Sequence, residues 1–532
     1  MTTKHEKPHS VDLENKLGDD VDNVSLEAGS QSLPSKNWLT RLRNALSSCA
    51  ETRGVAPVPI EERSDKDTLK LFTLWLTANC TTLPYVSNMT TGISGTLIFG
   101  LDLVVASVVI VLSTLLFMLP VAWMGMMGPK TGMRQMVQTR YYFGYYSISR
   151  LMNVSSVVAN SETSYYFSIG IALLQIATLI GYTIMTSIVS GQTLTAVSEG
   201  DLSLAVGITI SIVGALPISF LGYKYLHYID QYLWAPSFVA LVIVAGVSGK
   251  SLAVTGAEPV AISPRSVLTF AAACASLCTS WAPLVSDFAV YIDPSTPRIK
   301  IFLCVYAGYS VPSILLLILG AAAGASVPAN ETWAQAYGLY SVGGIINAMN
   351  SPLGGFGKFV SALLAFSVLG LTACTLYSLS ISFQSLHPIL SRLPRSLYSL
   401  VIVAIIVPIS IVASSNFYNS LSNFLSVVGY WTASYTSIAL TEHFCFRRGR
   451  YSAYNVSDWD NPKALPLGFA ALASLCFSFG LIVPSMDTAW YTGPIAVRTG
   501  DIGIQLGIAL SSLIYIVLRG AESRWKGGGR SP

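Results

Sequence analysis

The chain has 532 residues, of which 52% are hydrophobic and only 11% are charged. A soluble domain carries about 25% charged residues because its surface must face water, so this composition excludes an ordinary soluble protein. The formal net charge of +4 is spread over separate segments, which gives no support for nucleic-acid binding. The eight cysteines include no CxxC pair, and the sequence predicts neither a metal site nor a cofactor.

The hydropathy pattern predicts an all-α integral membrane protein with about twelve transmembrane helices. Residues 1–68 are polar and lack the apolar stretch of a signal peptide, which predicts a cytosolic, mostly disordered tail. Residues 69–518 are expected to form the membrane domain, and residues 519–532 a short cytosolic tail. The spans are expected at 70–92, 97–124, 167–190, 203–221, 232–249, 266–287, 301–324, 355–381, 397–413, 421–441, 466–484 and 501–518.

Lysine and arginine residues predict the orientation of the chain in the membrane. Placing the N-terminus in the cytosol puts most of them in loops on the cytosolic side, as the positive-inside rule requires. The other side then holds little more than Lys250, Arg265 and Arg498. Both termini are therefore expected in the cytosol. A glycosylation sequon that begins at Asn330 falls in an expected outside loop.

Two spans, the first and the sixth, are interrupted by proline beside polar residues at matching places. The first contains Asn79 and Pro84, and the sixth contains Trp281 and Pro283. A proline frees a backbone carbonyl, which within a membrane needs a partner such as an ion or a substrate. A matched pair is typical of transporters that repeat a five-helix unit in inverted orientation and bind substrate near the midplane. The alternative is a pair of proline kinks packed against neighbouring helices.

The third and eighth spans occupy equivalent places in the two repeats and carry polar side chains. In the third span Tyr182 and Thr186 lie one turn apart, and in the eighth Thr372 and Thr375 share a face. Their hydroxyls suit the polar edge of a small ligand, and aromatic rings suit stacking on a flat one. We therefore predict a substrate site formed by Trp281, Tyr182, Thr186, Thr372, Thr375 and Asn79. The alternative is that the hydroxyls bond to their own helix or join helices together.

Three charged residues lie near the ends of spans, namely Asp102, Asp287 and Lys358. A charged side chain near a span end reaches the interface, so structural roles are expected as readily as functional ones. No acidic residue falls at an expected midplane, and the residues themselves therefore do not indicate proton coupling.

Several motifs resemble those of fungal purine-cytosine permeases. The stretch from Glu51 to Arg63 is similar to the segment that precedes the first helix in that family, and Gly128 to Gly144 is similar to its most specific loop. Further similar motifs are Ser280-Trp281, Ser286-Asp287-Phe288, Gly429-Tyr430-Trp431, Glu442-His443 and Phe446-Arg447-Arg448.

The resemblance covers nearly everything from Glu51 to Arg519. It implies membership of the nucleobase–cation symporter-1 family, with twelve helices in a LeuT-type arrangement of five plus five inverted helices and two further ones. It also implies proton-coupled uptake at the fungal plasma membrane, with H+ as the coupling ion.

The expected site departs from the pattern of that family. The third helix usually has a tryptophan and an asparagine where this chain has Tyr182 and Thr186, and residues 371–375 replace an asparagine-rich segment of the eighth helix. Asparagine offers a donor and an acceptor, whereas threonine offers one hydroxyl. Each buried partner left unpaired is expected to weaken nucleobase binding by roughly 1–3 kcal/mol.

The connection around residues 147–168 is polar and longer than the resemblance implies. It is either a real loop or the translation of an intron that was wrongly kept in the gene model, since deleting about twenty residues restores a short connection.

The sequence therefore predicts a proton-coupled importer of a purine- or cytosine-type nucleobase or a related small heterocycle, working by alternating access. Two alternatives stay open: the same scaffold carrying a vitamin, an allantoin-like compound or a specialised metabolite, and a membrane sensor without transport. No nucleophile elbow, phosphate loop or metal cluster indicates an enzyme. Besides the substrate, the expected partner is the lipid bilayer, and the oligomeric state is left open.

Overall fold

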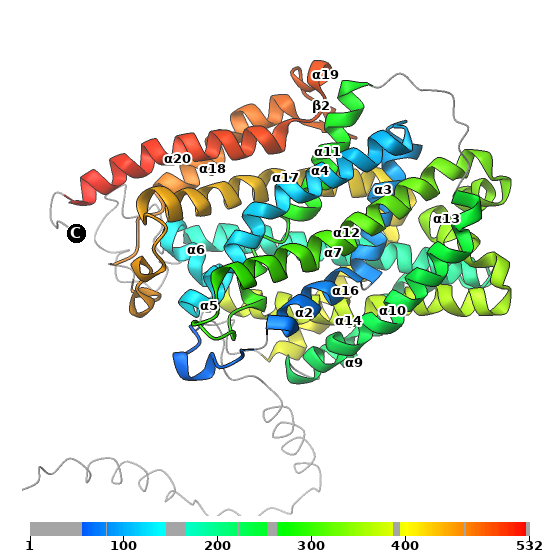
Figure 1. The fold of residues 1–532 in the computed structure, drawn as a ribbon, viewed down its shortest axis with the longest axis horizontal. Helices are drawn as coiled ribbons and strands as arrows, with labels where there is room; N and C mark the ends of the chain where they lie inside the picture. Colours follow the sequence, from blue (N-terminus) through cyan, green and yellow to red (C-terminus); the bar gives the residue numbers. More distant parts are fainter. Residues whose placement is uncertain are drawn as a thin grey trace, which may run out of the picture. The chain divides into compact units, whose positions relative to one another are not determined.

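The computed structural model describes residues 56–66, 68–80, 82–144, 166–220, 223–252, 263–386, 394–461 and 464–527. Most of the expected N-terminal tail and nearly all of the 147–168 connection lie outside these residues. The described residues are mainly helical (Figure 1).

One set of helices follows the expected spans. They are α2 (Thr68–Cys80), α3 (Thr82–Leu97), α4 (Leu103–Gly125), α7 (Tyr166–Val197), α8 (Leu204–Val213), α9 (Ala215–Phe220), α10 (Tyr223–Leu252), α11 (Pro264–Thr279), α12 (Arg298–Ser326), α14 (Gly355–Leu386), α16 (Arg395–Ala413), α17 (Phe417–Thr441), α18 (Phe469–Ser485) and α20 (Gly503–Gly527). The connections contain α5 (Met127–Thr131), α6 (Gln135–Phe143), α13 (Glu331–Asn350) and α19 (Ala496–Thr499).

Each expected span coincides with one helix or with two successive ones. The first span is divided into α2 and α3, and the fourth into α8 and α9. Among the residues that the structure describes, seven apolar segments of at least 18 residues are long enough to cross a membrane, and one of them, Ser396–Phe446, spans nearly all of α16 and the whole of α17. Segments Leu204–Phe220 and Phe469–Ser485 are apolar but shorter. The prediction of about twelve membrane helices is therefore confirmed.

The outer surfaces of these helices are apolar. On α4, the side chains of Val104, Val108, Leu112 and Leu116 are all more than half exposed and repeat every four residues. That spacing places them on one side of the helix. Because a soluble protein does not expose such a stripe, this side of α4 is suited to contact lipid.

Short polar side chains begin several helices. The Asp102 carboxylate accepts a hydrogen bond from the Val104 N–H at 2.9 Å and caps α4. The Asn330 side chain accepts one from the Trp333 N–H at 3.2 Å and caps α13. Such caps satisfy amides that have no partner within the helix. Asp102 therefore has a structural role, while glycosylation of Asn330 stays a prediction.

The helix α12 lies against α2, α3 and α4, and α7 packs along α14 (Figure 1). The approach of α12 to α3 is close, because a Cβ placed on Gly320 would lie 2.3 Å from the Met89 carbonyl oxygen. Gly92 faces the same contact, where a Cβ would lie 2.1 Å from the Leu317 oxygen. Small residues that allow two backbones to meet are a common means of association between membrane helices.

The helices α17, α18 and α20 form another packed group, with α18 and α20 along one edge of the view (Figure 1). A two-stranded hairpin, β1 (Asp487–Thr488) and β2 (Tyr491–Thr492), connects α18 to α19 and α20. The Ala489 N–H in its turn donates to the Asn423 side chain of α17 at 2.9 Å. The hairpin is thus fixed to the start of α17.

We predict that Gly320→Ala lowers the free energy of unfolding by about 1–3 kcal/mol, because the added methyl group overpacks the contact between α3 and α12. Gly246→Ala on α10 is the matched control, since a Cβ there meets nothing within 4 Å. Thermal unfolding of the detergent-purified protein measures the difference. Equal unfolding midpoints for the two variants would contradict the close approach.

Candidate functional site

The sixth span is interrupted at the place that its proline predicts. Helix α11 ends at Thr279, and a 3-10 turn begins at Val285. Between them the backbone makes turn-type bonds, such as that from the Ala282 N–H to the Thr279 oxygen at 3.0 Å. The Leu277 oxygen in the last turn of α11 accepts from the side chains of Ser280 and Tyr309 instead of continuing the helix.

Asn79 lies in the last turn of α2, beside the division between α2 and α3, and is fully buried. Its amide nitrogen donates to the Trp75 oxygen at 2.9 Å, and its oxygen accepts from the Ser313 hydroxyl of α12 at 3.2 Å. Asn88 of α3 in turn donates to Ser313 at 3.3 Å. Both polar ends of Asn79 thus have partners within the protein and join α2, α3 and α12. Its role in substrate binding stays a prediction.

Trp281 lies in the α11 interruption and is partly buried. Its ring meets the edge of Trp75 from α2, with centroids 5.4 Å apart and an interplanar angle of 69°. Tyr309 of α12 makes a similar contact at 6.3 Å, and Phe288 lies at the same distance. Aromatic rings favour such edge contacts. The structure therefore brings Trp281 to the meeting point of the first, sixth and seventh spans.

Tyr182 reaches the same interruption from α7. Its hydroxyl donates to the Ser280 hydroxyl at 2.9 Å, next to Trp281. Its ring contacts the edge of Phe424 from α17 at 4.9 Å. A Cβ on Gly181 would lie 2.1 Å from the Phe424 ring, so this approach requires glycine. Ser280 and Phe424 were not predicted as site residues, and a lone phenylalanine in an apolar span gives no signal in the sequence.

The three predicted threonines differ in their contacts. The Thr186 hydroxyl is buried and donates to the Tyr182 backbone oxygen at 2.8 Å. This is a bond within its own helix, which was the alternative to a role in the substrate site. Thr372 is fully buried on α14, and its hydroxyl has no hydrogen-bond partner among the described residues. Thr375, on the same helix, is also buried, with 8% of its surface exposed. Thr372 is therefore the predicted hydroxyl that a ligand would most readily engage.

The loop that most resembles the permease motif closes one end of the membrane domain. The Lys130 ammonium donates to the backbone oxygens of Pro294 and Thr296, the latter at 2.9 Å. The Arg63 guanidinium donates to the Pro129 oxygen at 3.1 Å. The loop thus joins the segment before α2 to the connection between the sixth and seventh spans. We call this the α5–α6 end, and the opposite one the hairpin end.

The other two charged residues near span ends also have structural partners. The Asp287 carboxylate accepts from the Gln135 N–H at the start of α6 at 2.6 Å. Lys358 forms an ion pair with Glu199 at 2.5 Å, and this hydrogen bond lowers the pKa of the Glu199 carboxyl. Both contacts lie at ends of the membrane domain, in agreement with the interfacial positions expected from the sequence.

The first and sixth spans are each divided and meet inside a bundle of apolar helices. This arrangement is typical of multi-pass secondary transporters. The chain belongs to the family of permeases for cytosine/purines, uracil, thiamine and allantoin, whose model matches residues 57–503. The resemblance found in the sequence is confirmed. The homologues of this chain are permeases, so the chain is a member of a transporter family and not an enzyme.

Curated relatives cover most of the chain. The purine-cytosine permease FCY22 of Saccharomyces cerevisiae is 32% identical over 502 residues, covering 92% of this chain and 90% of the relative. The purine-cytosine permease fcyB of Emericella nidulans is 31% identical over 483 residues, covering 90% of each. The vitamin B6 transporter TPN1 of Saccharomyces cerevisiae is 25% identical over 547 residues, covering 92% and 90%.

Among solved structures, Mhp1, a nucleobase-cation-symport-1 family transporter in a closed conformation with bromovinylhydantoin bound, has a TM-score of 0.63 at 13% identity. The match covers 89% of this chain and 96% of Mhp1. The inward-facing conformation of Mhp1 has a TM-score of 0.59. The predicted fold class, a LeuT-type inverted repeat with two further helices, is confirmed.

We predict that Asn79→Ala destabilises the protein by about 1–3 kcal/mol, because the buried Ser313 hydroxyl loses the acceptor of its proton and α2 loses its polar link to α12. Asn347→Ala is the control, since that partly buried amide makes one bond, to the Ala196 oxygen at 3.1 Å. Thermal unfolding in detergent compares the two. A midpoint for Asn79→Ala at or above that of Asn347→Ala would show that Asn79 does not join the helices.

Proposed function

We propose that this chain is a proton symporter that imports a purine- or cytosine-type nucleobase or a related small heterocycle across the plasma membrane by alternating access. In this proposal both termini and the α5–α6 end face the cytosol, and the hairpin end faces outside. The supporting observation is the convergence of Tyr182, Ser280 and Trp281 at the interruption of α11. Proton coupling rests on the resemblance to fungal permeases.

In the proposed site, Trp281 contacts the face of the heterocycle and Thr372 hydrogen-bonds its edge, with Tyr182, Thr186, Thr375 and Asn79 around them. An aromatic face binds any flat ring and does not distinguish one heterocycle from another. Discrimination therefore depends on the polar groups that remain available to the ligand.

A second candidate function is transport of a vitamin such as pyridoxine. It is favoured by the 25% identity to a vitamin B6 transporter over 92% of this chain. It is also favoured by Tyr182 and Thr186, which stand where the purine-cytosine pattern has tryptophan and asparagine.

The test is uptake of radiolabelled cytosine, adenine, hypoxanthine and pyridoxine in a fungal strain that lacks its own permeases. We expect saturable uptake of at least one compound, stimulated by an acidic medium and abolished by a protonophore. Trp281→Ala is expected to remove uptake, because the ring loses its stacking partner. Expression should be compared with and without residues 147–168.

Surface localisation of a fluorescent fusion is the control for this experiment. Uptake of pyridoxine alone would favour the second candidate. A folded protein at the cell surface that moves none of the four compounds would contradict nucleobase import and favour another heterocycle or a sensor. Uptake that persists with the protonophore would contradict proton coupling.

We further predict that Thr372→Val raises the KM of the transported compound by about two- to tenfold, the equivalent of one lost hydrogen bond of about 0.5–1.5 kcal/mol. Thr186→Val is the matched control, with a KM close to that of the wild type, because the Thr186 hydroxyl is already bonded within α7. Initial uptake rates at equal surface expression measure both. A larger rise for Thr186→Val would reverse the assignment of the two hydroxyls.

A further inference from the structure

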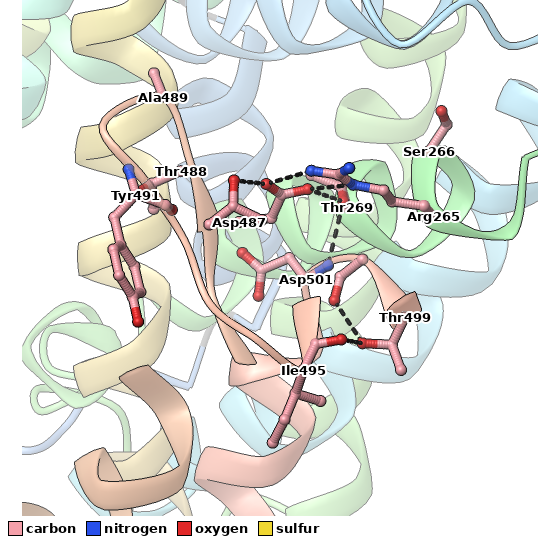
Figure 2. Close-up of polar contacts among 12 residues, drawn as sticks. Arg265, Ser266, Thr269, Asp487, Thr488, Ala489, Tyr491, Ile495, Thr499 and Asp501 are labelled. Atoms are coloured by element: carbon pink, nitrogen blue, oxygen red, sulfur yellow. Dashed lines mark hydrogen bonds and ion pairs between the residues drawn. The ribbon is translucent and has the colours of Figure 1, made fainter. Parts of the chain in front are cut away.

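A network of polar side chains lies at the hairpin end (Figure 2). The Arg265 guanidinium, at the start of α11, donates to both carboxylate oxygens of Asp487 in the hairpin, each at 3.0 Å. Thr269 and Thr492 donate to the same carboxylate at 3.4 and 2.8 Å. The hairpin is therefore held against α11 by a two-pronged ion pair.

A second carboxyl, Asp501, lies beside this pair and is only 1% exposed. It accepts from the Tyr430 hydroxyl of α17 at 2.5 Å and from the Gly503 N–H at 2.9 Å. Its own N–H donates to the Thr269 hydroxyl of α11 at 3.1 Å (Figure 2). Asp501 thus joins α11, α17 and the start of α20 at a single point.

The network contains two carboxyls and one arginine. Arg265 is committed to Asp487, and no ion pair links Asp501 to a lysine or arginine of the described residues. The groups that face Asp501 are the Tyr430 hydroxyl, the backbone N–H groups of Gly503 and Asp487, and the Asp487 carboxylate, which repels a second negative charge. Burial and a like charge beside a carboxyl favour its protonated form, whereas donors to the carboxylate oppose this; here burial is the largest effect.

One residue of this network, Thr269, also borders a small crevice at the hairpin end, between α3, α11 and α17. Its walls include Thr91, Phe99, Thr269, Tyr418, Ser422 and Ser426. Thr269 belongs to both the crevice and the network, and Tyr430 lies one turn of α17 beyond Ser426. Any separation of α11 from α17 at this end must break the contacts of Asp501.

We propose that Asp501 is an external proton site whose protonation holds this crevice closed. The proposal rests on the orientation given under the proposed function and not on the identity of the substrate. Proton binding from an acidic medium would then favour closure of the outer side, which is the step that must follow substrate entry from outside.

The direction of the pH effect follows from burial. Burial raises the pKa of Asp501 to about 6; the Tyr430 hydroxyl and the backbone N–H groups of Gly503 and Asp487 oppose this, and the Asp487 charge adds to it. A hydrated aspartate has a pKa of about 3.9. Protons therefore bind more tightly to the closed crevice than to an open one, so acid favours closure, and raising the external pH through about 6 favours opening.

The test measures access to the crevice by a cysteine placed at Ser422. Intact cells that express Ser422→Cys are treated with a membrane-impermeant maleimide at external pH 5 and pH 7.5. Because the thiol itself reacts faster at higher pH, each rate is divided by that of Ala329→Cys, an exposed position in the connection before α13. The normalised rate is expected to rise about tenfold between the two pH values.

Three further variants, each combined with Ser422→Cys, test whether Asp501 is the group that causes the pH response of labelling. Asp501→Asn cannot ionise, and its normalised rate should stay low at both pH values. Tyr430→Phe removes a donor that stabilises the carboxylate, so its midpoint should move to higher pH. Asp102→Asn is the matched control, a carboxyl that caps only α4, and should retain the wild-type response.

An equal pH response in wild type and Asp501→Asn would overturn the proposal, as would loss of the response in Asp102→Asn or an absence of labelling at every pH. If Asp501→Asn does not reach the surface, the shifted midpoint of Tyr430→Phe decides the question. Uptake is measured in parallel. The expected labelling pattern without uptake would contradict the proposed transport and leave the proton site in place.

Discussion

Backbone amides and carbonyls inside a hydrocarbon layer must find their hydrogen-bond partners within the protein. Regular helices meet this requirement by themselves, whereas the interruption of α11 does not. There the Leu277 oxygen accepts from the Tyr309 hydroxyl of α12 at 2.9 Å and from the Ser280 hydroxyl at 2.9 Å. Tyr182 of α7 then donates to Ser280. The break is therefore maintained by neighbouring helices, and the proposed site exists because those helices are in place.

The two ends of the membrane domain are fastened by different sets of side chains. At the α5–α6 end, Lys130 and Arg63 donate to backbone carbonyls of neighbouring segments. At the hairpin end, Arg265 pairs with the Asp487 carboxylate, and Asp501 is buried beside it. A cation bonded to carbonyls keeps its contact over a wide pH range, whereas carboxyl contacts change when a proton binds. The α5–α6 end also contains a carboxyl contact, between Asp287 and the Gln135 N–H, so a response to pH is expected there as well as at the hairpin end.

The sequence predicted the membrane helices well because hydropathy over about twenty residues is a strong local signal. It also located the α11 interruption through Pro283. The helices α6 and α13 and the hairpin, which lie in the connections, were not predicted. The bond between Ser313 and Asn79 shows why the site was predicted less completely: its two residues are 234 positions apart. No local pattern identifies such a partner.

The departures from the purine-cytosine pattern gain a physical meaning from these contacts. The Tyr182 hydroxyl donates a hydrogen bond to Ser280, and the Thr186 hydroxyl donates one to the Tyr182 backbone oxygen. Both polar ends of Asn79 are also hydrogen-bonded within the protein. Polar groups engaged in this way contribute little to reading the edge of a ligand. A site that relies on an aromatic face and few available hydroxyls rejects ligands of similar shape only weakly, by about 1–3 kcal/mol. Tolerance of several flat heterocycles, rather than strict selection of one nucleobase, is therefore what this arrangement of side chains favours.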